Sequence, residues 1–236
     1  MALDADELTN KIETTLEMTD KDGNPVNPEK MAKAISVGLV TALKSCTTMN
    51  PTVLGTGIAT NAPAPNAGQF VAGKAINGKF VGLTPAPIIS EGMAILTEGV
   101  DPKYHALMKS RFTAQATAIV GYFTASGMIQ FDKVEGICPA LLPIPPPFPG
   151  APGALIGGRA KNGKVIGLNG PALTNMVASA MGLVPIPPKM IDFYTAITDY
   201  VTENIEVEYL ANSVNGGFGV GGGALSGGIA VGGIVN

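Results

Sequence analysis

Apolar residues recur at helical spacing in several stretches of the chain. Leu8, Ile12 and Leu16 share one face of a segment from about Asp4 to Met18, and their i, i+4, i+8 spacing predicts an amphipathic helix. A second helix is expected from Pro28 to about Cys46, because an apolar stripe runs along its whole length. The same pattern predicts four further helices, over 88–96, 102–123, 173–181 and 188–201. The helices therefore come in pairs, and each pair is expected to form a helical hairpin.

A short stretch of β-prone sequence follows each pair of helices. The predicted strands cover 52–58, 128–134 and 205–209. In the last of these, Ile205, Val207 and Tyr209 alternate with glutamates, which is the pattern of a strand with one buried face.

Two further stretches, FVAGKAINGKFVGL at 70–83 and LIGGRAKNGKVIGL at 155–168, are identical at seven of fourteen positions. They place the pairs Asn77-Gly78 and Asn162-Gly163 between apolar runs. Asn-Gly in this setting predicts a type I′ turn, because both central residues of that turn need φ > 0. The sequence therefore predicts two equivalent β-hairpins.

These two stretches belong to a longer internal repeat. Each ends in Gly-Leu and continues into a helix with Thr84 or Asn169 at the expected N-cap, and the N-terminus places Asp4 at the same step. We therefore divide the chain into repeat units 1–83, 84–168 and 169–236, the last with a Gly-rich C-terminal arm. The predicted fold is α+β: three tandem units of helical hairpin plus short β-strand or β-hairpin, with long Gly/Pro-rich extended loops, packed as one body. The repeat also motivates the hypothesis of a pseudo-threefold face for a symmetric partner.

The composition points to a chain that packs against neighbours. Of 236 residues, 46% are hydrophobic and 14% are charged, whereas a solitary soluble protein carries about 25% charged residues. The net charge of −3, without any Lys/Arg cluster, argues against nucleic-acid binding. No basic segment precedes an apolar one at the start, so no secretion signal is expected.

Three long stretches carry no charged side chain, between Lys44 and Lys74, between Glu135 and Arg159, and from Glu208 to the C-terminus. The second is rich in proline and the third in glycine, so neither forms the continuous helix of about 20 residues that spans a membrane. We expect extended or polyproline-like arms that become ordered against neighbouring surfaces. The expected partners are other subunits of a multi-subunit assembly, with no nucleic acid and no membrane span.

Candidate catalytic and metal-binding residues are few. Cys46, Cys138 and the single histidine, His105, do not supply the four ligands of a structural zinc site. Residues 18–29 resemble a calcium loop, but a methionine stands at the first ligand position and two prolines interrupt it. The GVGGGA string at 219–224 has the spacing of a dinucleotide-binding turn, yet no acidic residue follows it. We therefore expect no enzyme, no cofactor and no metal, and two buried, reduced thiols.

A set of cationic and aromatic residues is the expected contact surface. The cations flank the two Asn-Gly turns, where they either meet an acidic partner surface or protect an exposed hairpin edge. The aromatic members are phenylalanines of the uncharged stretches. The predicted interface residues are Phe70, Lys74, Lys79, Phe148, Arg159, Lys164 and Phe218.

The MALDADEL opening, the second helix that starts at a proline, and the Gly/Ala/Pro-rich segment ending in NGK resemble the small Gly- and Ala-rich virion structural proteins encoded in tail and neck gene clusters of tailed bacteriophages. The resemblance implies a non-enzymatic component of the tail, baseplate or neck, assembled in the host cytoplasm and located in the virion. A head-decorating or cementing role is the nearest alternative. A cell-surface or glycan-binding adhesin module is the runner-up from another class, and an enzyme is third because no polar constellation is visible.

Overall fold

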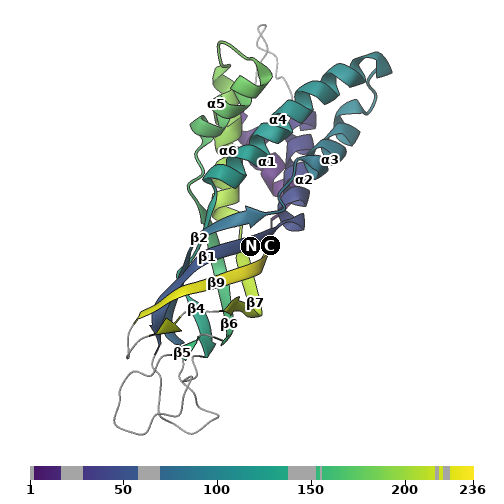
Figure 1. Cartoon of the computed structure of the whole chain (residues 1–236). Helices are drawn as coiled ribbons and strands as arrows, with labels where there is room; N and C mark the ends of the chain where they lie inside the picture. The colour runs from purple at the N-terminus through teal and green to yellow at the C-terminus, as the bar shows by residue number, and fades with distance from the viewer. Residues whose placement is uncertain are drawn as a thin grey trace, which may run out of the picture. The chain divides into compact units, whose positions relative to one another are not determined.

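The structure, a computed structural model, describes residues 3–16, 29–57, 70–137, 153–154, 156–215, 218–219 and 224–236. The chain separates into a helical unit and a strand unit (Figure 1). The helical unit draws on Met1–Cys46, Gly82–Gly127 and Gly167–Ile205, and the strand unit on Thr47–Val81, Met128–Ile166 and Glu206–Asn236. Each unit therefore collects pieces from all three predicted repeat units.

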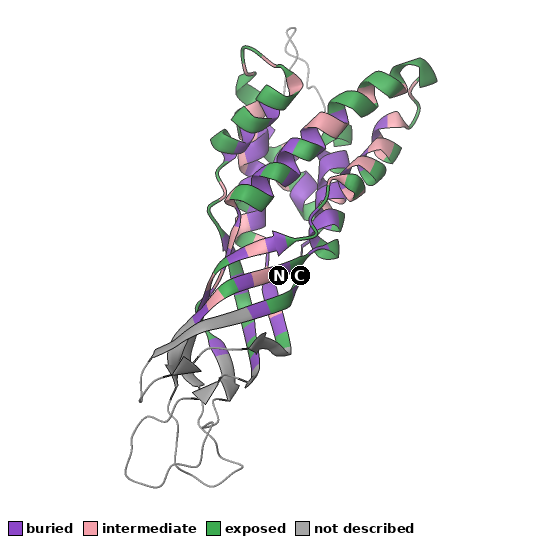
Figure 2. Ribbon diagram, in the orientation of Figure 1, coloured by how far each residue is buried: buried purple, intermediate pink, exposed green. Residues whose placement is uncertain are grey.

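Six α-helices and one short 3-10 helix make up the described part of the helical unit. They are α1 (Ala5–Leu16), α2 (Glu29–Ser45), α3 (Ala86–Thr97), η1 (Pro102–Tyr104), α4 (His105–Ser126), α5 (Gly170–Met181) and α6 (Pro188–Asn204). Each α-helix packs on the next along the chain and α6 packs on α1, so the six form a closed ring. Buried residues recur along these helices (Figure 2), as the apolar stripes require. All six predicted helices are confirmed.

Two of the three predicted N-caps are confirmed. Asp4 Oδ1 accepts hydrogen bonds from two backbone N–H groups in the first turn of α1, at 2.8 and 3.0 Å. Asn169 Oδ1 accepts one from the first turn of α5, at 3.0 Å. The prediction for Thr84 is wrong, because Pro85 holds the N-cap position of α3 and makes no side-chain cap.

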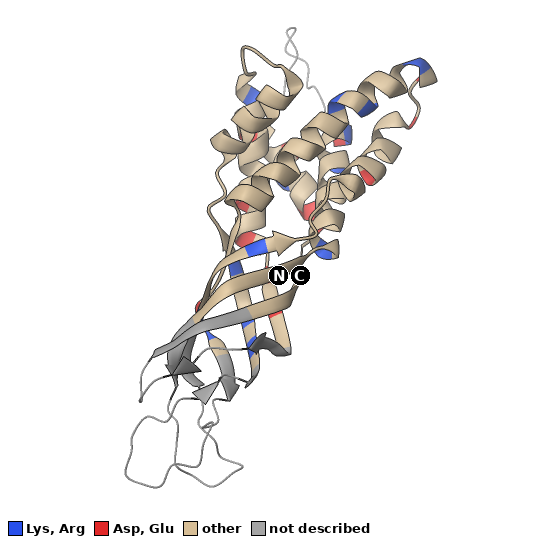
Figure 3. Ribbon diagram, viewed as in Figure 1, with Lys and Arg blue, Asp and Glu red and all other residues tan. Residues whose placement is uncertain are grey.

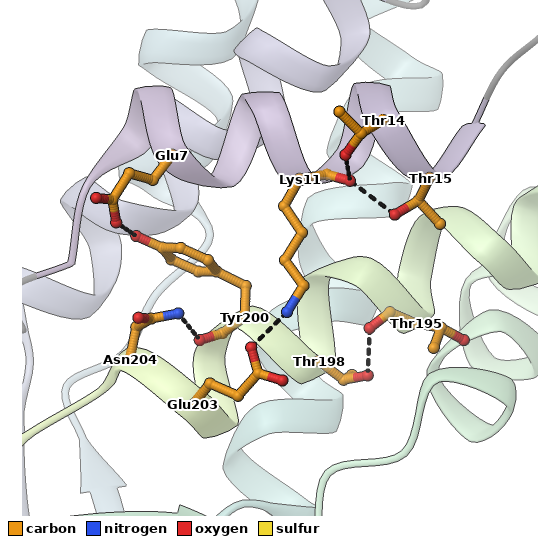
Figure 4. Close-up of polar contacts among 9 residues, drawn as sticks. All are labelled: Glu7, Lys11, Thr14, Thr15, Thr195, Thr198, Tyr200, Glu203 and Asn204. Carbon is orange, nitrogen blue, oxygen red and sulfur yellow. Dashed lines mark hydrogen bonds and ion pairs between the residues drawn. The ribbon is translucent and has the colours of Figure 1, made fainter.

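A tyrosine near the end of α6 is hydrogen-bonded to the residue that precedes α1. Tyr200 Oη accepts a hydrogen bond from the backbone N–H of Asp4 and donates one to its C=O, both at 2.8 Å. An ion pair between Lys11 and Glu203 joins the same two helices (Figure 4). Tyr122 of α4 makes the same two bonds, at 2.8 and 3.1 Å, to the backbone of the α5 N-cap residue. Each tyrosine thus ties the end of one helix to the start of another.

The strand unit contains a closed antiparallel barrel of six strands. The described strands are β1 (Thr47–Gly57), β2 (Phe70–Val81), β3 (Met128–Phe131), β4 (Val134–Ile137), β5 (Gly153–Ala154), β6 (Ile156–Ile166), β7 (Val207–Asn215), β8 (Phe218–Gly219) and β9 (Ala224–Val235). The barrel order is β1-β2-β3-β6-β7-β9, and pairing of β9 with β1 closes it. Outside this path, β4 pairs with β6, β8 with β9 and β5 with β8.

The predicted fold of three tandem units with long extended loops is therefore wrong, although the α+β class is loosely compatible with the structure. Helices from all three segments join one another, and so do the strands. The C-terminal segment was expected to be an extended arm, but its described part contains β9, which pairs with both β1 and β7. An isolated two-stranded hairpin is marginally stable, whereas a closed barrel leaves no unpaired edge. The division at residues 83 and 168 remains a prediction.

The two predicted β-hairpins are also wrong, because the Asn-Gly pairs lie within single strands. Asn77 in β2 and Asn162 in β6 do have positive φ, 59° and 57°. At each asparagine, the strand advances three residues while the strand paired with it advances two. This extra residue makes a β-bulge. Gly232 in β9, with φ of 70°, lies at a similar irregularity. A positive φ at Asn suits a bulge as well as a turn, and the pairing strand decides between them.

Each of these positive-φ residues is followed by a glycine that makes room for a large side chain in the barrel. A Cβ atom at that glycine would overlap the neighbouring side chain. The pairs are Gly78 with Asn50, Gly163 with Phe131, and Gly233 with Tyr209; a Cβ at Gly233 would also overlap the Thr48 hydroxyl. The three large side chains stand on β1, β3 and β7, each at the fifth residue after the preceding helix. The bulges therefore serve the packing of the barrel interior.

The side chains that meet in the barrel interior satisfy one another's polar groups. Tyr209 Oη donates to Asn50 Oδ1 at 2.8 Å and accepts from Thr48 Oγ1 at 3.1 Å. Asn50 Nδ2 donates to the C=O of Ile129 at 2.8 Å. The Phe131 ring lies 5.0 Å from the Tyr209 ring, centroid to centroid. The barrel is therefore filled at this level, and its polar groups are paired.

We predict that Gly163→Ala lowers the free energy of unfolding by about 1–3 kcal/mol, because the new methyl group overlaps the Phe131 ring. Urea denaturation followed by circular dichroism measures the change. Adding Phe131→Leu should recover part of the loss. Gly121→Ala is the control: its Cβ would meet nothing within 4 Å on α4, so stability should rise by about 0.5–1 kcal/mol. Equal effects of the two substitutions would contradict the packing argument.

Burial raises the pKa of Tyr209 from 10.0 to about 12. The folded state therefore keeps a proton that the unfolded chain releases, so this contribution to stability is complete below pH 10 and is lost as the pH rises to 12. We expect Tyr209→Phe to lower stability by about 1–3 kcal/mol below that window, because Asn50 and Thr48 lose a partner. As the pH rises from 10 to 12, the free energy of unfolding of the variant should fall less than that of the parent. Tyr104→Phe, at an exposed site, is the control and should leave the free energy of unfolding below pH 10 unchanged.

Candidate functional site

The four cationic residues of the predicted interface lie on two strands separated by β3. Lys74 and Lys79 are on β2, and Arg159 and Lys164 are on β6. The predicted phenylalanines add little: the backbone of Phe70 begins β2, that of Phe218 lies in β8, and Phe148 is outside the described residues. The structure thus places the four cations on two strands, and their role as an interface remains a prediction.

Two lysines on β6 form ion pairs with glutamates around the start of β7. Lys161 Nζ lies 3.2 Å from Glu208 Oε1, and Lys164 Nζ lies 3.9 Å from Glu206 Oε1. A cavity of about 200 Å³ lined by Lys133, Arg159 and Lys161 lies on this part of the barrel. Exposed ion pairs of this kind contribute about 0–1 kcal/mol each. Whether the cations of this surface meet an acidic partner therefore remains a prediction.

Four apolar side chains lie around Thr47, and beside Lys79, on the outside of the barrel over β2, β1 and β9. Thr47 is paired with both Val81 and Ile234, and Met49 is paired with both Lys79 and Val231. The alternate residues of these strands face the interior, so these face outward. Val81, Val231 and Ile234 are 44%, 44% and 42% exposed. We call Met49, Val81, Val231 and Ile234 the apolar strip; charged residues are sparse along the described chain (Figure 3).

The helical unit contains an apolar groove of about 340 Å³. Its walls come from the end of α1, the start of α2, the end of α5, the connection to α6 and the start of α6. The wall residues are Leu16, Met31, Met181, Leu183, Pro187 and Met190. Lys189 is the charged residue among those that line it. Methionine side chains are flexible and polarisable, so such walls adapt to the shape of an apolar guest.

Two polar side chains lie at the base of this groove. Gln115 of α4 and Tyr194 of α6 are 6% and 1% exposed, and both line the groove. Gln115 Nε2 donates a hydrogen bond to Tyr194 Oη at 2.7 Å. Burial raises the pKa of Tyr194, so its hydroxyl stays protonated. Among the described residues, the structure shows no acceptor for that proton and no donor to Gln115 Oε1. An apolar groove with one paired polar group at its base is the usual form of a binding site.

Sequence reasoning missed this groove, although one signal was present. Gln115 lies between Phe112 and Ile119 on the buried face of a helix, where a polar residue needs a partner. That partner, Tyr194, stands in a helix 79 positions further along the chain. No local pattern shows that the two meet.

The sequence offers Cys46, Cys138 and His105 as candidates for catalysis or metal binding, and the structure describes two of them. Cys46 is buried and free, and burial raises its pKa to about 11, so its thiol is unreactive. Cys138 lies outside the described residues, as does most of the calcium-like segment. His105 Nε2 lies 2.9 Å from the C=O of Val100. Within the described ranges, no group of three His, Cys, Asp or Glu side chains is placed to hold a metal ion.

The described helices also lack a membrane span: none is both long enough and apolar enough to cross a bilayer.

Comparison with protein-family models, with curated protein sequences and with solved structures found no match to this chain.

We expect Tyr194→Phe to lower the free energy of unfolding by about 1–3 kcal/mol, because it leaves the buried amide of Gln115 without a partner. Gln115→Leu should likewise be destabilising through the loss of the Tyr194 contact. The double variant should lose less than the sum of the two single losses, because no polar group is then left unpaired. Urea denaturation of all four proteins completes the cycle. Strict additivity would show that the bond contributes nothing to stability.

Proposed function

We propose that this chain is a non-enzymatic structural component of a bacteriophage particle, in the tail, baseplate or neck, that binds neighbouring subunits through apolar surfaces. The observation that carries the proposal is the apolar strip on the barrel. Large groups of neighbouring exposed apolar side chains are rare on monomers that act alone, and they mark sites of protein contact. The charged fraction of 14% supports the same role.

The choice of a phage particle, assembled in the host cytoplasm, rests on the resemblance to Gly- and Ala-rich virion proteins. Head decoration or cementing is the nearest alternative, and the apolar strip would serve it equally well. An adhesin or glycan-binding module has less support. Of the large hydrophobic side chains that are exposed in the described part of the chain, one, Tyr104, is aromatic.

We expect the chain to co-purify with particles isolated by density gradient from a lysate of the source culture. Quantitative mass spectrometry should find it in a fixed ratio to the major capsid protein. Antibody labelling in electron micrographs should place it on tails or necks, whereas labelling of heads would favour the decorating role. Recovery only among unassembled soluble proteins or on cell surfaces would contradict the proposal.

The apolar strip gives this test a matched pair of variants. Val81→Lys with Ile234→Lys adds two charges to the strip, and we expect incorporation into particles to fall about tenfold or more, because a buried unpaired charge is costly. Ile166→Lys is the control, since Ile166 is 39% exposed on β6, which does not pair with β1, β2 or β9. The variants are supplied from a plasmid to a host whose phage copy is disrupted. Folding of each is checked by circular dichroism.

A further inference from the structure

We propose that the groove on the helical unit binds the uncharged, proline-rich segment 138–152 of a second copy of this chain. This inference rests on the assembly role proposed above and names one contact within it. Its basis is the match between the chemistry of the groove and the chemistry of that segment.

The walls of the groove select an uncharged, apolar guest. Six of the lining residues are Leu, Met or Pro, and Lys189 is the charged one. The volume of about 340 Å³ is at the lower end of the usual range for ligand pockets, about 300–1,000 Å³. It accommodates a few apolar side chains and not a whole helix. An extended segment that inserts side chains one after another therefore fits it best.

The base of the groove selects a peptide group. The Tyr194 hydroxyl has a proton to donate and Gln115 Oε1 has a lone pair to accept with, and both residues are more than nine-tenths buried. A backbone C=O satisfies the first of these groups, and a backbone N–H satisfies the second. A hydrocarbon guest would leave both unsatisfied, at a cost in free energy. A peptide therefore fits the groove better than a purely apolar ligand.

Residues 138–152 have the required chemistry. They carry seven prolines and no charged side chain, and Leu142, Ile144 and Phe148 are spaced among the prolines. Proline-rich segments dock in apolar, aromatic-lined grooves, because their polyproline conformation loses little entropy on binding. Proline also lacks an N–H, so such a segment offers mainly carbonyls, the partner that Tyr194 lacks.

The segment nearest in sequence to the groove is a poorer guest. Residues 17–28 follow Leu16 directly, but they include Glu17, Asp20, Lys21 and Asp22. Moving charged side chains into an apolar groove is costly unless each is paired. The proline-rich segment carries no such cost.

The experiment uses the full chain, labelled with ¹³C at its methionine methyl groups, and a synthetic peptide of residues 138–152 with serine in place of Cys138. We expect the methyl resonances of Met31, Met181 and Met190 to shift saturably on peptide addition. Those of Met49 and Met176 should not move, because they lie on the barrel and on the outer side of α5. The three groove resonances should also shift as the chain itself is concentrated, since each copy carries the segment.

Matched variants make the assignment specific. Met181→Lys should weaken peptide binding about tenfold or more, whereas Met176→Lys on the same helix should leave the dissociation constant within about twofold. Tyr194→Phe should weaken it about threefold to tenfold through the lost hydrogen bond. A peptide with serine in place of Leu142, Ile144 and Phe148 should not bind. The parent and variant spectra report whether each chain is folded.

Two results would overturn the inference: no saturable shift with a folded chain, or shifts confined to methionines outside the groove. The outcome is separable from that of the particle experiment. If the chain is present in particles but the peptide leaves the groove unchanged, the docking inference fails and the structural role stands. If the peptide binds and the chain is absent from particles, the contact is real and the proposed role in the virion fails.

Discussion

The closure of the barrel is the constraint on which most of the structure depends. Strand β9, at the end of the chain, must pair with β1, so residues more than 180 positions apart meet in one sheet. Closure removes the unpaired edges that would otherwise recruit other strands. It also brings Asn50, Phe131 and Tyr209 together inside, and the space they need is made by glycines beside the bulges. A barrel of this kind tolerates Gly-rich, uncharged strands because each pairs on both sides.

The helical unit is also closed, and a side chain bonded to backbone groups stabilises its closure. Its helices form a ring that closes between the last and the first, and Tyr200 holds that junction by bonding both backbone groups of Asp4. The tyrosine hydroxyl donates and accepts at once, so one side chain satisfies a donor and an acceptor. Both units therefore join distant parts of the chain. The proposed contact surfaces are the apolar strip on the strand unit and the apolar groove on the helical unit.

The parts of the fold that depend on local sequence were predictable. The six helices follow from apolar residues at helical spacing, and the caps at Asp4 and Asn169 follow from side chains that accept backbone hydrogen bonds. The positive φ of the asparagine in each Asn-Gly pair was predicted correctly, but the hairpin turn expected there is a β-bulge. Asn77 and Asn162 take positive φ in a bulge as readily as in a turn, so the local signal is the same for both. The groove was not predictable, because its polar pair joins two helices far apart in sequence.

By itself, the sequence determined which segments are helical, which favour extended structure, and which stretches carry no charge. Periodicity reports that one face of a segment is buried, but it does not identify the neighbour that buries it. Only the tertiary structure decided that helices join helices and strands join strands across three similar segments, and that a Gly-rich terminus becomes a central strand. The physical reason is that pairing and packing partners are chosen by the free energy of the whole assembly of elements. A local pattern contains no record of that choice.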